Sequence, residues 1–138
     1  MFDVGSRDGG ANIVLATSND QRHPPENMMD GTEETFWSST GLYPQEFIMS
    51  FGHMMDVQRV SISSYNIRHL QIEKCTSSDG STFEPLTEKD LPQTDGQLQN
   101  EDIDIQTKAT HLRFIVTAGY DHFIAVHKLN IAGNALHG

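Results

Sequence analysis

Cysteine is almost absent from this sequence, and no long apolar segment occurs in it. The single cysteine, Cys75, rules out an internal disulfide, and there is no Asn-x-Ser/Thr sequon. Both features favour a reducing, intracellular compartment. No apolar run approaches the roughly 18 residues of a transmembrane helix, and the N-terminus lacks the charged and apolar regions of a secretory signal. We therefore expect neither membrane insertion nor a signal peptide.

Positive charge is also scarce. Nine Lys and Arg residues stand against 19 Asp and Glu residues, which gives a formal net charge of −10. Nucleic acid and anionic lipid attract clustered positive charge, so this balance argues against both as partners. The acidic segment 88–106 has Lys89 as its only basic residue. Its simplest interpretation is a solvated strand face and loop, and the alternative is a surface that steers a basic partner.

Short segments in which apolar and polar residues alternate run through most of the chain. This alternation predicts strands with one buried and one solvated face. Residues 12–17 are typical of a first strand, and the later apolar positions are Phe47, Met49, Phe51, Val60, Ile62, Leu70, Ile72, Ile103, Ile105, Leu112, Phe114, Val116, Ile124, Val126, Leu129 and Ile131. Turn signals separate them at Gly52-His53, Asp79-Gly80, Asp95-Gly96, Gly119 and Gly133. The pattern predicts an all-β antiparallel sandwich or barrel, in one domain over residues 1–138 with loosely ordered termini.

Residues 24–37 combine turn formers, oxygen-bearing side chains and the only Trp of the chain, Trp37. Asp30-Gly31 predicts a tight turn, because Gly tolerates positive φ. The oxygen-bearing side chains around it are Asn27, Asp30, Thr32, Glu33, Glu34 and Thr35. Calcium binds such oxygens on irregular chain. The residues alone leave two interpretations open, a solvated acidic turn before a core Trp or a metal site.

Residues that could perform catalysis form no recognisable motif. His122 and His127 are five positions apart, and such positions in a strand point to opposite faces. The sequence has no Cys-x-x-Cys, no Gly-x-Ser-x-Gly and no phosphate-binding Gly-rich segment. Cys75 lies in an alternating segment, where a small core or face residue is the usual interpretation. We expect a protein that is not an enzyme.

The segment from Pro24 to Trp37, followed by many strands, resembles the N-terminal hallmark of the discoidin, or coagulation-factor C-type, superfamily. The matching positions are Asn27, Asp30-Gly31, Thr35 and Trp37. These proteins are galactose-binding-like jelly rolls, so the resemblance implies a jelly-roll sandwich. It occurs in carbohydrate-binding modules, lectins and intracellular adaptors alike, and therefore indicates fold more than function.

A longer resemblance is to the small discoidin-fold subunits of the intraflagellar transport B complex, which also carry a small-heat-shock name. It covers roughly residues 12–133 in five blocks. These are 15–18 with 23–27, then 36–37 with 40–41 and 44–48, then 72–74, then 88–91 with 96–101, and finally 112–115 with 121–123 and 126–127. The resemblance implies a non-enzymatic subunit that forms a stable heterodimer with a Rab-like small GTPase, joins other intraflagellar transport B subunits, and works in the cytoplasm and the cilium or flagellum.

The same resemblance implies a structural calcium ion with Asn27, Asp30 and Thr35 as ligands. Many sugar-binding relatives add a Glu a few residues before the closing Gly, and the corresponding residue here is Lys128. A charged Lys cannot be a ligand. The site would then depend on fewer carboxylates or on a main-chain carbonyl.

A carbohydrate-binding module of the same fold is the alternative function. Tyr43, His53, Arg68 and His69 are the candidate loop residues for it, although they form no recognisable sugar motif. Binding of a glycan that a monosaccharide competes away would favour this alternative.

Overall fold

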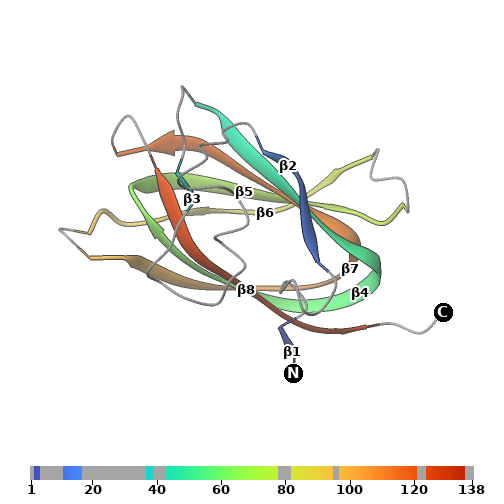
Figure 1. Ribbon diagram of the computed structural model, residues 1–138. Helices are drawn as coiled ribbons and strands as arrows, with labels where there is room; N and C mark the ends of the chain where they lie inside the picture. The colour runs from blue at the N-terminus through green and yellow to red at the C-terminus, as the bar shows by residue number, and fades with distance from the viewer. Residues whose placement is uncertain are drawn as a thin grey trace.

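The computed structural model describes residues 2–3, 11–16, 37–38, 43–77, 82–94, 97–120 and 124–135, and every regular element among them is a strand. The eight strands, shown in Figure 1, are β1 (Phe2–Asp3), β2 (Asn12–Ala16), β3 (Trp37–Ser38), β4 (Gln45–Tyr65), β5 (Ile67–Cys75), β6 (Glu84–Asp90), β7 (Gln99–Gly119) and β8 (Ala125–Ala135). All pairings are antiparallel. The expected all-β antiparallel fold is confirmed.

No helix among the described residues is long and apolar enough to cross a membrane.

The strands form a sandwich of two layers that share β4 and β7. In the first layer, residues 45–50 of β4 pair with β2 and with residues 111–116 of β7, and β5 and β6 follow on the other side of β7. In the second layer, residues 55–65 of β4 lie between residues 99–109 of β7 and β8, and β8 also pairs with β1 and β3. Figure 1 shows β4 and β7 curving together from one layer into the other.

The two long strands correct the expected turn at Gly52-His53. These residues lie inside β4, and the strands predicted around 102–105 and 112–116 are likewise parts of β7. The pairing of β4 with β7 shifts register between Ser50 and Met55, which marks a bend. Strands that pass between packed sheets turn the corner by such bulges instead of ending.

The predicted turn at Gly133 is also wrong, whereas Gly119 does end its strand. Gly133 lies within β8, paired with both Phe2 and Val57. A Cβ at this position would lie 2.2 Å from the backbone oxygen of Asp56. The glycine is therefore required by the close approach of β8 to β4, and not by a change of chain direction.

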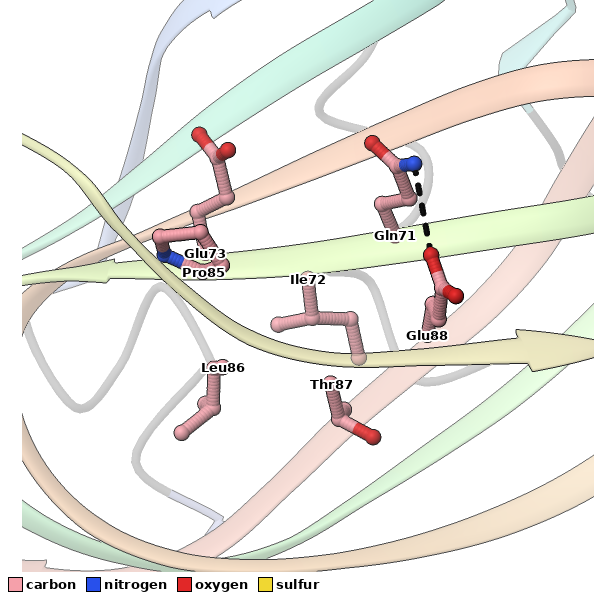
Figure 2. A pocket seen from close by; sticks show the side chains of 7 residues that line it. All are labelled: Gln71, Ile72, Glu73, Pro85, Leu86, Thr87 and Glu88. Atoms are coloured by element: carbon pink, nitrogen blue, oxygen red, sulfur yellow. Dashed lines mark hydrogen bonds between the residues drawn. The ribbon is translucent and has the colours of Figure 1, made fainter.

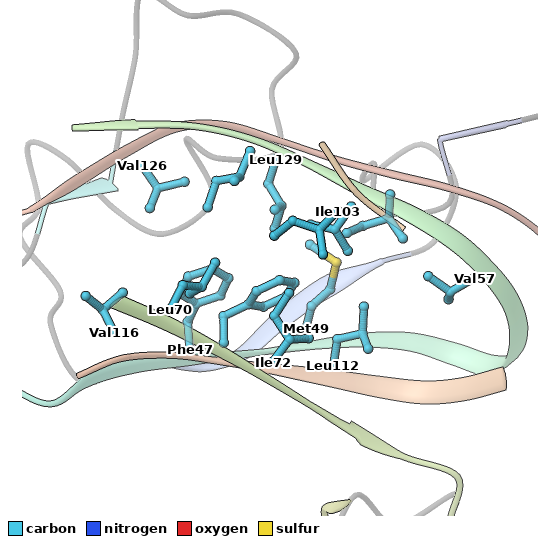
Figure 3. Close-up of a cluster of buried hydrophobic side chains, with 14 of the residues drawn as sticks. Phe47, Met49, Val57, Leu70, Ile72, Ile103, Leu112, Val116, Val126 and Leu129 are labelled. Atoms are coloured by element: carbon cyan, nitrogen blue, oxygen red, sulfur yellow. The ribbon is translucent and has the colours of Figure 1, made fainter. Parts of the chain in front are cut away.

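The hydrophobic core fills the space between the layers, as Figure 3 shows for its central side chains. Trp37 is fully buried and packs edge-to-face on Phe47 at 5.3 Å between ring centroids, and Phe47 stacks on Phe114 at 4.8 Å. Such aromatic pairs add to the free energy gained by burial. Trp37 is thus a core residue, as expected for the last position of the 24–37 segment.

Strand β6 was not predicted, because its sequence, Glu-Pro-Leu-Thr-Glu-Lys-Asp, lacks the alternation of a half-buried strand. It is an edge strand, paired with β5 alone among the described strands. Two lysines connect the first layer to the part of β7 that lies in the second layer. Lys89 lies 3.2 Å from Glu101, and Lys74 donates to Thr107 at 3.1 Å. Pro and Lys on an edge strand discourage pairing with other chains.

Candidate functional site

The predicted metal ligands Asn27, Asp30 and Thr35 lie outside the described residues. Trp37, which ends the same segment, is described and buried. Among the described residues, no group of three or more His, Cys, Asp and Glu side chains is placed to hold a metal ion. The calcium site therefore remains a prediction that rests on donor chemistry.

Lys128, which the sequence comparison singles out as a departure from the calcium-site pattern, belongs to a polar groove across the second layer. It pairs with Ser63 across β8 and β4. The groove has a volume of about 350 Å³, and its polar lining includes Ser61, Ser63, Asn100, Asp102, Lys128 and Asn130. Its lining combines carboxylate, amide and hydroxyl groups with one ammonium group.

A ladder of side-chain hydrogen bonds runs along this groove between β4 and β7. Its three rungs join residues that are directly opposite in register: Arg59 to Asp104 at 2.8 Å, Ser61 to Asp102 at 2.6 Å, and Ser63 to Asn100 at 2.7 Å. Val60, Ile62 and Ile103, at the alternate positions, belong to the core. The ladder therefore faces away from the core.

The acidic segment 88–106 supplies one side of this ladder, and its charges are largely solvated. Asp90, Asp102 and Asp104 are exposed. Glu101 is half-buried and lies beside Lys89. For the described residues of 88–106, the interpretation as a solvated strand face and loop is confirmed, with the addition that several of the acids have partners inside the molecule, while Asp95 lies outside the described residues.

The first layer carries a second charged cluster, centred on Arg113 of β7. Its Nε and Nη2 atoms both donate to Glu46 Oε2, the first at 3.0 Å, and Nη1 donates to Glu73 Oε1 at 3.1 Å. The guanidinium also lies 5.8 Å from the centre of the Phe83 ring. Burial opposes the charge, but the bonds to Glu46 and Glu73 outweigh it and raise the pKa of Arg113. This cluster ties β4, β7 and β5 together across one face.

A groove of about 360 Å³ lies beside that cluster, between β5 and β6 (Figure 2). Ile72, Pro85 and Leu86 give it apolar walls, and Glu73 and Glu88 line it as well. In Figure 2 the Gln71 amide reaches Glu88, to which it donates at 3.4 Å. The register shift between Ile72 and Glu73 marks a bulge at this place.

One end of the sandwich is fixed by the buried side chain of Gln99. The amide nitrogen donates to the carbonyls of Ile67 and Pro92, each at 2.8 Å, and the amide oxygen accepts from Ser64 Oγ and Ile67 N–H at 3.0 and 3.1 Å. All four hydrogen-bonding positions of the amide are thus filled. Nothing in the sequence pattern marks this glutamine, because its partners are distant along the chain.

Of the four residues predicted as candidates for carbohydrate binding, the three whose side chains the structure describes have separate environments. Tyr43 is half-buried and packs against the core, and its hydroxyl lies where a Cβ on Gly119 would be. His69 contacts Glu88 and Asp90. Arg68 is exposed, and the side chain of His53 lies outside the described part of the chain.

Cys75 is buried at the end of β5, as expected for a small core or face residue. Thr110 donates to the carbonyls of Cys75 and Ser77, at 3.0 and 2.8 Å. Burial disfavours the thiolate, but hydrogen bonds from Ser77, Thr82 and Thr110 together lower the pKa of the thiol. The burial of Cys75 and these hydrogen bonds indicate that the residue has a structural role in the fold.

Comparison with known proteins identifies the family. The F5/8 type C domain matches residues 14–129. The mouse protein named intraflagellar transport protein 25 homolog is 48% identical over 132 residues, which cover 95% of this chain and 92% of that protein. Intraflagellar transport protein 25 of Chlamydomonas reinhardtii is 35% identical over 133 residues, which cover 96% of this chain and 70% of that protein.

The chain belongs to the intraflagellar transport protein 25 family. Its fold is that of the F5/8 type C, or discoidin, domain, so the jelly-roll prediction is confirmed. Among solved structures, a family 32 carbohydrate-binding module of Clostridium perfringens in complex with GalNAc-β-1,3-galactose has a TM-score of 0.75 at 21% identity, covering 89% of this chain and 95% of that one. This likeness shows that the intraflagellar transport protein 25 family shares the fold of a sugar-binding module.

Proposed function

We propose that this chain forms a stable heterodimer with a Rab-like small GTPase within the intraflagellar transport B complex. Membership of the intraflagellar transport protein 25 family makes the chain a non-enzymatic transport subunit of the cilium or flagellum. The observation that carries the proposal is the 48% identity over 95% of the chain, because it extends over the whole domain and beyond the discoidin hallmark.

The surface of the described residues suits a protein partner. Both layers carry side chains that are already held by cross-strand contacts, namely the Arg59–Asp104, Ser61–Asp102 and Ser63–Asn100 ladder and the Arg113 cluster. Side chains fixed before binding lose little conformational entropy when a partner docks. Pre-organised sheet faces therefore favour association with another folded protein.

Co-expression with the GTPase tests the proposal. We expect the two chains to elute together from affinity and size-exclusion columns at about 0.5 M salt, where exposed charge pairs are strongly screened. A Rab GTPase of vesicle transport serves as the matched control and should elute separately. Separation of the Rab-like GTPase from this chain under the same conditions would show that the proposed heterodimer is wrong.

We also propose a structural calcium ion bound by Asn27, Asp30 and Thr35. A carboxylate, an amide and a hydroxyl are ligands that calcium accepts, and main-chain carbonyls commonly complete its six to eight oxygens. The segment leads directly into Trp37, whose indole is buried in the core. An ion that fixes the segment would thereby stabilise the folded sandwich.

A further inference from the structure

The imidazole of His69 lies between two carboxylates of the neighbouring edge strand. Its Nδ1 atom is 2.5 Å from Asp90 Oδ1, and its Nε2 atom is 3.4 Å from Glu88 Oε2. His69 and Asp90 are directly opposite each other in the β5–β6 pairing, and Glu88 is opposite Gln71. Both ring nitrogens therefore face the same strand, β6.

This geometry suits the protonated ring better than the neutral one. An ionised carboxylate only accepts hydrogen bonds, so each of the two oxygens requires an N–H from the ring. Imidazolium has two N–H groups and satisfies both, whereas neutral imidazole has one and directs a lone pair at the other carboxylate. Loss of the proton thus converts one of the two attractions into a repulsion.

The strand that these contacts hold lies at the edge of the sheet, and the residues that follow it are anchored, because Leu91 is buried in the core and the Pro92 carbonyl accepts from the Gln99 amide. Among the described strands, β6 pairs only with β5. Beyond that pairing, Lys89 contacts Glu101. Leu91, the first residue after β6, donates its N–H to the Arg68 carbonyl at 2.9 Å, and its carbonyl accepts from the Tyr120 hydroxyl at 2.6 Å. The contacts of His69 thus lie at the C-terminal end of β6, where Asp90 is the last residue.

We propose that His69 is a proton-operated latch, which holds the C-terminal end of β6 to β5 when protonated and loosens it when neutral. The charged groups around the ring support this assignment. From β6, Asp90 and Glu88 face it, while Lys89 is directed to Glu101. From β7, Ala118 is opposite, and on β5 itself Arg68 is exposed and Gln71 donates to Glu88.

The pH range of the latch follows from linkage. The hydrogen bond with Asp90, helped by Glu88, raises the pKa of His69 above its ordinary value of 6.5. A group whose folded-state pKa is raised contributes its full stabilisation below the unfolded value, and that contribution is lost as the pH rises through the folded value. The contact between His69 and β6 is therefore expected to weaken as the pH rises above 6.5.

Two NMR measurements on the full chain test the proposal. The first is the titration of the His69 ring between pH 5.5 and 8.5. The second is hydrogen exchange of the β6 amides over the same range, corrected for the intrinsic pH dependence of exchange. We expect the midpoint for His69 to lie above 6.5 and the corrected β6 exchange rate to increase about two- to fivefold through that midpoint, the range typical of exposed ion pairs.

Three variants separate the latch from a general effect of pH. His69→Gln should abolish the pH-dependent change in β6 exchange, whereas His127→Gln, which removes a histidine from β8, should leave it intact. Asp90→Asn should lower the His69 midpoint and reduce the change. A His69 midpoint at or below 6.5, or an equal change in β6 exchange in His69→Gln and wild type, would overturn the proposal.

Discussion

At the scale of single residues, the Gln99 amide connects three separate segments of the chain. Its four hydrogen bonds reach Ser64 at the end of β4, Ile67 at the start of β5, and Pro92 after β6. Between β4 and β5 the chain turns through Asn66, which has φ of 67°, a value that Asn adopts more readily than most residues. Gln99 thus bonds the Ser64 hydroxyl before this turn and the N–H and carbonyl of Ile67 after it.

Replacing Gln99 with Leu should destabilise the fold strongly. The variant keeps the volume of the side chain but leaves the N–H of Ile67 and the carbonyls of Ile67 and Pro92 without that partner. Buried groups that lose a hydrogen bond cost about 1–3 kcal/mol each, so we expect a loss of about 3 kcal/mol in the free energy of unfolding. Urea denaturation followed by tryptophan fluorescence measures it.

The exposed Gln97 offers the matched control, since Gln97→Leu makes the same chemical change two residues away. An exposed substitution should alter the free energy of unfolding by no more than about 0.5 kcal/mol. Equal losses for the two variants would refute the role assigned to the Gln99 amide.

At the scale of elements, the strands of the first layer are joined by charge as well as by backbone pairing. Arg113 of β7 lies between Glu46 of β4 and Glu73 of β5, and the three side chains are 31%, 22% and 20% exposed. Arg59 of β4 and Asp104 of β7, in the second layer, are 52% and 69% exposed. Solvent screens the second pair far more than the first cluster.

The difference in exposure leads to a prediction about the two arginines. Arg113→Met should lower the free energy of unfolding by about 2 kcal/mol, because it leaves two half-buried carboxylates facing each other without a cation. Arg59→Met should lower it by no more than about 0.5 kcal/mol. Chemical denaturation of both variants measures the difference, and a loss for Arg59→Met as large as that for Arg113→Met would contradict it.

At the scale of the whole molecule, two layers that share β4 and β7 must unfold together. The same two strands contribute residues to both sides of the core, among them Phe47 and Ile62 from β4 and Ile103 and Phe114 from β7. An ion or a partner that binds only the folded chain therefore stabilises the sandwich as a unit.

The proposed calcium ion can be tested through this coupling. If Asp30 is a ligand, calcium at about 100 times its dissociation constant should stabilise the wild-type chain by about 2.7 kcal/mol, and the melting temperature should rise. Asp30→Ala should remove the response, and Glu33→Ala, a neighbouring acid outside the ligand set, should retain it. A melting temperature that responds to calcium equally in Asp30→Ala and wild type would remove the proposed site.

The fold was predictable from sequence where side-chain alternation is regular. The positions from Phe47 to Met49 and from Leu112 to Val116 have the expected period, and the core contains the predicted side chains except Ile105, which is partly buried against it. Alternation does not report where a strand ends, because a bulge preserves extended chain while it changes direction. Alternation therefore predicts a turn where the chain only bends near Gly52, and it does not reveal β6, because an edge strand needs little apolar sequence.

The surface sites were less predictable. The Arg113 cluster and the contacts of Gln99 join residues that are 32 or more positions apart along the chain, apart from the bond between Gln99 and Pro92. His69 was considered only as a loop residue for sugar binding, and its two carboxylate partners became evident only from the β5–β6 register. Pairs of this kind depend on strand register, which no local pattern in this chain specifies.

The sequence by itself determined the class of fold, the acidic charge, and the family through its separated matching blocks. The fold class and the charge depend on local periodicity and on composition, which each segment carries alone, and the family depends on the resemblance of those separated blocks to known proteins. Only the tertiary structure decided that β4 and β7 serve both layers, that Gly133 is needed for a close backbone approach, and that His69 lies between Glu88 and Asp90. Each of those depends on which strands are adjacent and in what register, and long-range packing sets both.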